Sequence, residues 1–318
     1  MSLILRLLVT CALFLFVFYQ VGLFSEEGRS QFIELLGRAN VLWLIVSVLA
    51  GVLVNLSSAL KWFMLAKARD LGAGFWRMFS YYLIGQFYNL VLPTSVGGDV
   101  VRAYELGRFS GRQADALASV FVERYTGVVM LLVLSGLAFL SQLAVFSVDL
   151  VIFSLALFTF GLGFIAWMIF DPRLYVFVKS LLGSRFAFTQ RIFQKLDKLL
   201  DSVQVYGQHR SALIWAFVNS LIFYLLAVFN VYVTAMVFEQ DIMIMHMLVA
   251  TPIIMLIMNI PFSIGNWGVM EIGYSSVFVL LGYSPALGLS VAILMRLKSF
   301  LDGAMGGVLH PLFVTKKH

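Results

Sequence analysis

The sequence predicts an all-α integral membrane protein: a polytopic helical bundle of two inverted repeats, each containing a broken, re-entrant helical hairpin. Three observations lead to this fold class. The 318-residue chain is 61% apolar and only 12% charged, with a mean hydropathy of +0.96, whereas a soluble domain is about one quarter charged. Its apolar stretches are long enough to cross a bilayer. Two of these stretches are interrupted by similar Pro-Ser-Gly segments.

Six uninterrupted apolar stretches are each long enough to cross about 30 Å of hydrocarbon as a helix. They comprise residues 3–24, 41–68, 114–140, 150–170, 213–238 and 286–312. Two further stretches, 78–108 and 246–282, are equally apolar but contain a break. Each of these two fits either a half-way helix that turns back or two short full crossings. In both cases the chain leaves the membrane on the side from which it entered, so the sides of the following loops are the same.

The charges of the loops predict the orientation of the chain, because loops rich in Lys and Arg stay in the cytoplasm. Segment 171–212 contains seven Lys or Arg against three Asp, and 66–77 contains three against one Asp. Segment 239–246 carries only one Glu and one Asp as charged residues. If the chain makes six crossings and both of its ends lie in the cytoplasm, every one of these basic loops is cytoplasmic. We therefore expect a multi-pass protein of the inner (plasma) membrane with N- and C-termini in the cytoplasm.

The chain 1–318 is expected to form a single transmembrane domain with an internal repeat. Residues 3–140 and 150–312 follow the same order of span, amphipathic stretch, span, broken hairpin and span. Each half makes three crossings, and an odd number places the second half upside down relative to the first. The two broken hairpins are then expected to enter the membrane from opposite sides.

The two breaks contain residues that interrupt a helix. The first contains Pro93, Ser95, Gly97 and Gly98, and the second, 168 residues later, contains Pro261, Ser263, Gly265 and Gly268. Proline ends a helix, and glycine permits a sharp turn and a close approach of another group. A helix that restarts at Asp99 would present free N–H groups to an anion, with Arg102 one turn further on. Alternatively, Asp99 caps this helix and pairs with Arg102; the two roles are compatible.

Ionisable side chains inside a bilayer are costly, so they are usually functional or paired. The candidates for substrate binding are Asp99, Arg102, Glu123, Arg124, Glu271 and Arg296. Glu123 and Arg124 point about 100° apart on a helix, so we expect one to line a cavity and the other to pair with the cytoplasmic base. Arg296 lies near the middle of the last span, and Glu271 is its expected partner, either in a structural bridge or in a pocket. Lys298 and Asp302, one turn apart, are expected to neutralise each other.

Composition argues against several other classes of protein. One Cys and four His leave no internal disulfide and little scope for a metal cluster, so we expect no metal and no cofactor. The net charge of +6 comes from basic residues beside the spans, which membrane topology explains without nucleic acid. We find no nucleotide-binding motif, so transport would be driven by an ion gradient, the membrane potential or a lipid gradient.

The stretch 181–206 has apolar residues near helical spacing and is expected to lie under the cytoplasmic leaflet or to pack on the protein's own base.

The two breaks together resemble a known family. The pattern is Pro93-Thr94-Ser95-Val96-Gly97-Gly98-Asp99-x-x-Arg102, then Glu123-Arg124, then Pro261-x-Ser263-x-Gly265-x-x-Gly268-x-x-Glu271. It resembles the lysylphosphatidylglycerol synthase transmembrane region, a flippase-like family, over nearly the whole chain. The resemblance implies that the six charged candidates line a central cavity between the two halves. The best-known relatives carry an added aminoacyl-transferase domain; the chain ends at His318 without room for one, so we do not expect synthase activity.

The sequence therefore favours a lipid flippase that moves a headgroup bearing phosphate through a charged central cavity. The expected partners are membrane lipids: an anionic phospholipid, a glycolipid or a polyprenyl phosphate. Two alternatives remain open at this point. The protein is a membrane enzyme acting on a lipid-linked substrate, or a non-transporting regulatory partner in lipid or lipid-linked glycan metabolism. A homo-oligomer or a complex with a lipid-synthesis enzyme is compatible with the sequence.

Overall fold

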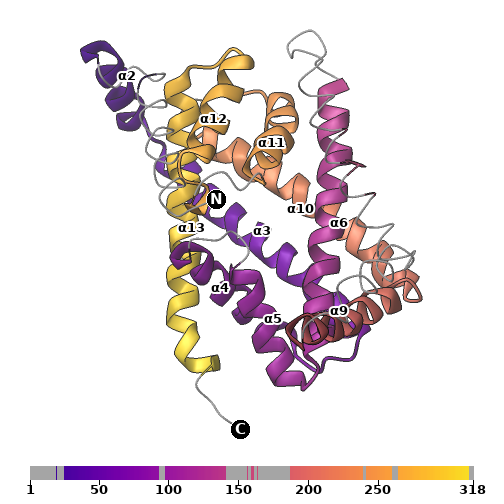
Figure 1. Cartoon of the computed structure of the whole chain (residues 1–318). Helices are drawn as coiled ribbons and strands as arrows, with labels where there is room; N and C mark the ends of the chain where they lie inside the picture. Colours follow the sequence, from indigo (N-terminus) through magenta and orange to yellow (C-terminus); the bar gives the residue numbers. More distant parts are fainter. Residues whose placement is uncertain are drawn as a thin grey trace.

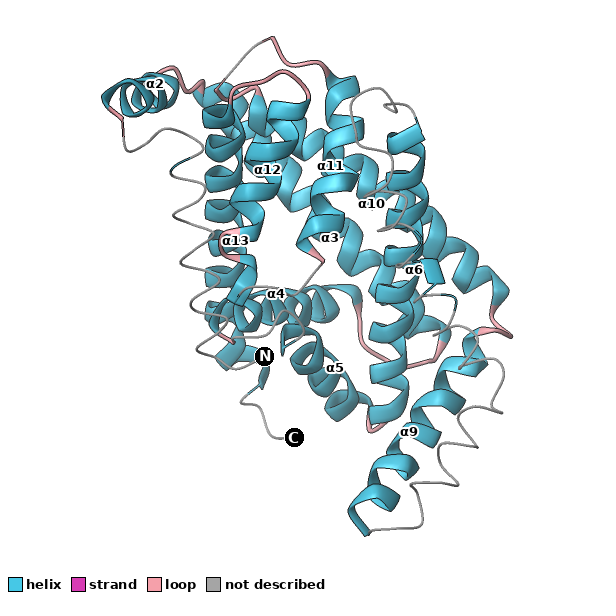
Figure 2. Ribbon diagram, turned by 45° about the horizontal axis from the view of Figure 1, so that its top comes forward, coloured by secondary structure: helices cyan, strands magenta, loops and turns pink. Residues whose placement is uncertain are grey.

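The structure is a computed structural model of the chain, and every regular element in its described part is a helix (Figures 1 and 2). The described residues are 25–92, 97–140, 187–238, 241–259 and 264–314, with the single positions 19, 156, 159, 160 and 163. The α-helices are α2 (Glu26–Gly37), α3 (Val41–Ala68), α4 (Phe75–Val91), α5 (Gly97–Ser110), α6 (Gln113–Leu140), α9 (Ala187–Tyr206), α10 (Arg210–Ala235), α11 (Ile244–Met258), α12 (Val269–Leu280) and α13 (Pro285–Val314), and Ile264–Asn266 forms the short 3₁₀ helix η1. An all-helical membrane protein is what the sequence predicts.

Three of the described helices, α3, α6 and α10, are long and apolar enough to cross a membrane. α3 has 28 residues, which corresponds to about 42 Å of helix. α13 has 30 residues, includes the predicted span 286–312 and carries three charged residues near its middle. The predicted spans 3–24 and 150–170 lie outside the described residues, apart from single positions.

The two predicted breaks each separate a pair of short helices. α4, with 17 residues, is about 25 Å long and slightly short of a full crossing. α11 and α12 are shorter still, with 15 and 12 residues. Between them the chain adopts left-handed backbone at Gly265, Asn266 and Gly268, where φ is 57°, 56° and 82°. Pro93, Ser95, Pro261 and Ser263 lie outside the described residues.

The helices are arranged so that the two broken pairs lie at opposite ends of the molecule (Figure 1). α4 and α5 lie in the lower half with α9 and the C-terminus, whereas α11 and α12 lie in the upper half with α2. α13 packs against α4, and α6 packs against α11. α3 packs along α10, and Asn40 at the start of α3 donates its backbone N–H to Val237 O just beyond α10 at 2.8 Å.

Two hydrophobic cores hold these helices together. One joins α3, α4, α5 and α6 around the fully buried Trp62, Met78 and Leu106. The other joins α10, α11, α12 and α13 around the fully buried Met247 and Phe278. Each core therefore surrounds one of the two breaks, and a break can be held in place by helices of its own half of the chain.

α9 packs on the end of the bundle through one apolar face. Val203 and Tyr206 are buried against Leu65 of α3 and Val122 of α6. The Tyr206 hydroxyl donates to Leu65 O at 3.0 Å. Of the two expectations for this stretch, packing on the protein's own base describes the C-terminal part of α9.

Candidate functional site

The start of α5 lies very close to α4 because both helices have glycine where they meet. A Cβ atom on Gly98 would overlap Gly85 O and the side chain of Asn89. The N–H of Gly98 donates to Asn89 Oδ1 at 2.8 Å, so one of the free donors at this helix start is satisfied within the protein. This close contact fixes the position of Asp99 in the first turn of α5.

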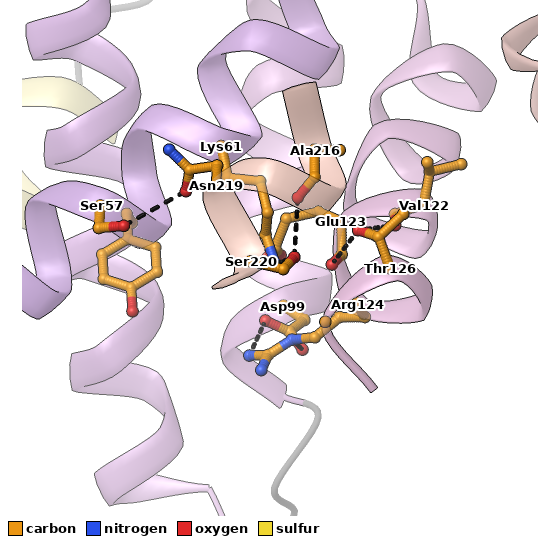
Figure 3. Close-up of polar contacts among 12 residues, drawn as sticks. Ser57, Lys61, Asp99, Val122, Glu123, Arg124, Thr126, Ala216, Asn219 and Ser220 are labelled. Atoms are coloured by element: carbon orange, nitrogen blue, oxygen red, sulfur yellow. Dashed lines mark hydrogen bonds and ion pairs between the residues drawn. The ribbon is translucent and has the colours of Figure 1, made fainter. Parts of the chain in front are cut away.

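Asp99 binds two arginines from two different helices. Its Oδ1 accepts from Arg102 Nε at 3.0 Å, as the sequence predicts for residues three apart. Arg124 on α6 approaches Asp99 with Nε at 2.8 Å from Oδ2 and Nη2 at 2.8 Å from Oδ1 (Figure 3). This two-point geometry is the strong form of an arginine–carboxylate pair.

A chain of buried charges continues from Asp99 into the bundle. Arg102 Nη2 donates to Glu123 Oε2 at 2.5 Å, and Lys61 Nζ lies 3.3 Å from Glu123 Oε1. Three cations (Lys61, Arg102 and Arg124) therefore face two carboxylates, which leaves an excess of one positive charge. The network joins α3, α5 and α6, and Lys61 links it to α10 through Ser220 at 3.2 Å.

Aromatic rings surround the most buried member of this network. The Arg102 guanidinium lies 4.8 Å from the Trp62 ring and 5.7 Å from the Tyr82 ring. Among the residues that the structure describes, its buried Nη1 has no hydrogen-bond partner, although both rings attract the cation. Arg102 is 2% exposed, so it lies behind the surface that a ligand would reach first.

Glu123 and Arg124 point in different directions, as their adjacency on α6 predicts. Glu123 points into the buried network, and the Arg124 side chain is 54% exposed. The expectation that one of the two pairs with the cytoplasmic base is wrong, because Glu123 binds Lys61 and Arg102 within the bundle. The reason is that Lys61 of α3 and Arg102 of α5 both reach the Glu123 carboxylate on α6.

Arg124 and Asp99 lie on the wall of a cavity of about 620 Å³. Two amides, Asn259 after α11 and Asn266 in η1, are its other polar lining residues. The remaining lining residues are apolar: Val100, Leu117, Val120, Phe121, Val128, Leu199, Met255 and Met258. The cavity thus offers one ion pair, two amides and a larger apolar surface that comes from α5, α6, α9 and α11.

The second break holds a comparable ion pair. Arg296 Nε lies 2.7 Å from Glu271 Oε1, and Arg296 Nη2 lies 3.1 Å from Glu271 Oε2. This is the partner that the sequence predicts for Arg296. Glu271 also accepts from the Gly268 N–H at 2.8 Å, and Arg296 donates to Asn266 O at 3.1 Å. The Trp267 ring lies 4.3 Å from the guanidinium. Arg296 thus contacts the break through Asn266 O and the Trp267 ring, and its partner Glu271 binds the Gly268 N–H.

The two ion pairs share one arrangement in the chain. Asp99 and Glu271 are each the third residue of the helix that follows a break. The arginine that each binds in a two-point contact stands 25 residues later, on α6 or on α13. The six candidate residues therefore form two groups, with Asp99, Arg102, Glu123 and Arg124 in one network and Glu271 and Arg296 in the other.

The comparison of the chain with known proteins gives its family. Residues 3–306 match the model of the family described as the lysylphosphatidylglycerol synthase TM region. The chain belongs to this family. The matched residues include both breaks, both ion pairs and the residues that line the cavity.

Two curated proteins are similar to this family member over most of their length. A UPF0104 membrane protein of Methanothermobacter thermautotrophicus is 22% identical over 307 residues, which are 90% of each chain. The UPF0104 membrane protein PH1989 of Pyrococcus horikoshii is 22% identical over 307 residues, which are 89% of this chain and 90% of the relative. No solved structure matches the chain. The chain is thus an integral membrane protein of a lipid-related family.

Several residues of the network are not among the six sequence candidates. Trp62, Tyr82 and Ser220 contact its cations. The signal that points to them is a run of polar residues on two apolar helices, Ser57, Ser58 and Lys61 on α3 and Asn219 and Ser220 on α10. Ser57 Oγ donates to Asn219 Oδ1 at 3.3 Å (Figure 3). Within the described residues, no three His, Cys, Asp or Glu side chains are grouped in a way that fits a metal ion.

Proposed function

We propose that the protein moves the polar headgroup of a membrane lipid across the bilayer through the cavity beside Arg124. The observation that carries this proposal is a half-exposed arginine on the wall of a mostly apolar cavity of about 620 Å³. A charge exposed in such surroundings is costly unless a ligand or water solvates it. A lipid supplies both a polar headgroup for Arg124 and apolar chains for the rest of the wall.

The proposed headgroup bears a phosphate. A guanidinium recognises phosphate through two parallel hydrogen bonds, and the network around Asp99 has an excess of one positive charge. An arriving phosphate would compete with Asp99 for Arg124, while Arg102 continues to hold Asp99 from the other side. Anionic phospholipids, phosphate-bearing glycolipids and polyprenyl phosphates all meet this requirement. The reaction is translocation, without chemical change of the lipid.

The proposal includes two inverted repeats, residues 3–140 and 150–312, with re-entrant hairpins formed by α4–α5 and α11–α12. The packing supports it, since α4 packs on α13 as α11 packs on α6. The amphipathic helices also correspond, since α2 packs on α13 as α9 packs on α6. Broken helices at the interface of inverted repeats are typical of transporters, in which one half moves against the other to alternate access.

The proposed orientation places both termini in the cytoplasm of a cell bounded by the plasma (inner) membrane. The basic segment 171–212 would then be cytoplasmic. Its C-terminal part, α9, lies at the same end of the molecule as the C-terminus (Figure 1). The hairpin α4–α5 would enter from the cytoplasm, and α11–α12 from outside.

Proteoliposomes containing fluorescent phospholipids or polyprenyl phosphates test the proposed function. We expect wild-type protein to move at least one of these lipids between leaflets, and Arg124→Gln to abolish the movement with normal insertion. The matched control is Arg38→Gln, which removes an exposed arginine that pairs with Glu34 on α2 and is expected to keep the wild-type rate. Equal rates for Arg124→Gln and wild type would contradict the proposal. A chemically altered lipid in the products would instead indicate an enzyme.

A further inference from the structure

Another buried cation, Lys298 on α13, lies apart from both ion pairs. Its ammonium group is bound by three side-chain oxygens of neutral residues: Ser47 Oγ at 2.8 Å, Asn230 Oδ1 at 2.7 Å and Thr234 Oγ1 at 2.8 Å. An ammonium has three N–H donors, and Ser47 O at 3.4 Å is a fourth acceptor beside the three side-chain oxygens. Lys298 is 7% exposed, and the three partners from α3 and α10 are buried with it.

No carboxylate contacts Lys298 among the described residues. The sequence predicts that Asp302, one turn further along α13, neutralises it. The two charges do attract each other, but the side chains form no ion pair within 4.0 Å. The reason is that Lys298 extends toward α3 and α10, where the hydroxyls and the amide lie.

The other charged side chains of α3, α10 and α13 bind other partners or stand at helix ends, many residues from those that bind Lys298. On α3, Lys61 binds Glu123, and on α13, Arg296 binds Glu271. Lys67 on α3 and Arg210 on α10 stand at helix ends, and the titratable side chains of α10 are Tyr224 and Tyr232. Tyr224 donates its hydroxyl to Gly127 O. The immediate surroundings of the ammonium are therefore polar but neutral.

This ring of oxygens is able to bind both protonation states of a lysine. An amine has two N–H donors and one lone pair, so it needs one donor from its surroundings. Ser47 Oγ and Thr234 Oγ1 lie 2.8 Å apart, and either hydroxyl can donate. Rotation of one hydroxyl proton thus converts an acceptor of the ammonium into a donor to the amine, without displacement of any heavy atom.

Two opposing effects make both states accessible. The low-dielectric interior penalises a charge that has no counter-ion in contact, whereas three short hydrogen bonds favour the ammonium. We propose that Lys298 is a proton-binding site that takes up and releases one proton during the working cycle of the protein. On release, an N–H bond breaks, its electron pair stays on Nζ, and the proton forms an O–H bond with water.

The site is open to a groove between two helices. A groove of about 530 Å³ between α3 and α13 has Lys298 and Asp302 as its charged lining residues, and the rest of its lining is glycine and apolar residues. The Asp302 carboxylate on this wall favours a cation nearby and is an acceptor that a proton leaving Lys298 would meet. The groove is separate from the cavity beside Arg124, because the two have no lining residue in common.

The consequence for transport rests on the proposed function. The ammonium ties α13 to α3 and α10, and Lys298 stands two residues after Arg296, which holds the second break. Loss of the proton replaces the charge-assisted hydrogen bonds of the ammonium with the weaker hydrogen bonds of a neutral amine, so the contact between these helices weakens. Proton binding at Lys298 therefore favours the arrangement described here, and release favours movement of α13, so that a proton gradient drives the lipid.

The first experiment observes the proton without requiring transport. Solid-state nitrogen NMR of lysine-labelled protein in lipid bilayers distinguishes an ammonium from an amine, and the Lys298 signal is the one lost in both Lys298→Arg and Lys298→Met. We expect this signal to change from ammonium to amine as the pH is raised across the range in which the protein stays folded. The matched variant Asp302→Asn is expected to keep the signal and shift its midpoint. An ammonium signal, or an amine signal, throughout this range overturns the proposal.

The second experiment measures lipid movement in proteoliposomes under an imposed pH gradient. We expect the wild-type rate to change severalfold when the gradient is reversed, and this response to be lost in Lys298→Arg, which is permanently charged, and in Lys298→Met, which is neutral. A gradient response that persists in both variants overturns the coupling. If the NMR signal titrates but wild-type protein moves no lipid at any pH, the proposed function fails and the proton site stands.

Discussion

Arg124 and Arg296 have matching positions in the chain but differ in exposure. Each stands 25 residues after the carboxylate that it binds in a two-point contact. The Arg124 side chain is 54% exposed and lies on a cavity, whereas that of Arg296 is 11% exposed and contacts backbone carbonyls of the second break. One pair is thus accessible to a ligand and the other is closed. The proposed function predicts that the two pairs exchange this accessibility as the protein passes between two end states.

The first prediction concerns the shape of the Arg124 side chain. Arg124→Lys keeps the charge but cannot contact a phosphate or Asp99 at two points. The loss of one charge-assisted hydrogen bond, about 1.5–3 kcal/mol, corresponds to a rate about 10- to 100-fold lower. Initial rates of lipid movement in proteoliposomes check this. A wild-type rate would mean that a point charge is sufficient at this position.

The second prediction concerns the buried network. Glu123→Gln removes the carboxylate that Lys61 binds and one of the two that Arg102 binds, and both cations are buried. Removal of one partner from a buried ion pair costs about 3–5 kcal/mol. Unfolding equilibria in mixed micelles measure the change in stability. For comparison, Glu34→Gln breaks an exposed i,i+4 pair with Arg38 and is expected to change stability by less than about 0.5 kcal/mol. Similar effects of both substitutions would contradict the described burial.

The third prediction tests the close approach of α4 and α5. In Gly98→Ala, the added methyl group would overlap Gly85 O and Asn89, and such overpacking costs about 1–3 kcal/mol. We also expect slower transport, because α5 carries Asp99. The matched control is Gly136→Ala on α6, where an added Cβ has no neighbour within 4 Å; alanine there is expected to be neutral or stabilising by up to about 1 kcal/mol. Thermal unfolding of both variants separates the two cases.

The fourth prediction concerns the second break. Arg296→Lys removes the fork that joins both Glu271 oxygens to Asn266 O. We expect amide hydrogens of residues 264–271 to exchange several times faster, since the break loses the group that holds it. Hydrogen exchange followed by mass spectrometry measures this locally, with α5 as the internal reference. Unchanged exchange in 264–271 would show that packing alone maintains the break.

Much of the fold follows from the sequence because the bilayer restricts what apolar segments can do. The predicted span 41–68 has the bounds of α3, and 286–312 lies within α13. Helical spacing also predicts the contact between Asp99 and Arg102, which are three residues apart. The breaks are predictable since proline and glycine act on the local backbone.

The contacts between distant helices are not predictable in the same way. Lys61 binds Glu123 because α3 and α6 present them to each other, and helical periodicity does not give the rotation of one helix relative to another. Lys298 shows the same limit, since spacing favours Asp302 as its partner whereas packing provides Ser47 and Asn230. Which of two adjacent residues faces the cavity likewise depends on the neighbouring helices.

In the proposed function, a lipid headgroup enters the cavity beside Arg124. A phospholipid with a photoreactive headgroup tests this in protein reconstituted in bilayers, with adducts mapped by mass spectrometry. We expect adducts at Phe121, which lines the cavity, and we expect them to be strongly reduced in Arg124→Gln. We expect far fewer adducts at Leu225, which is exposed near the middle of α10. Equal labelling of Phe121 and Leu225, or labelling of Phe121 that is independent of Arg124, would contradict it.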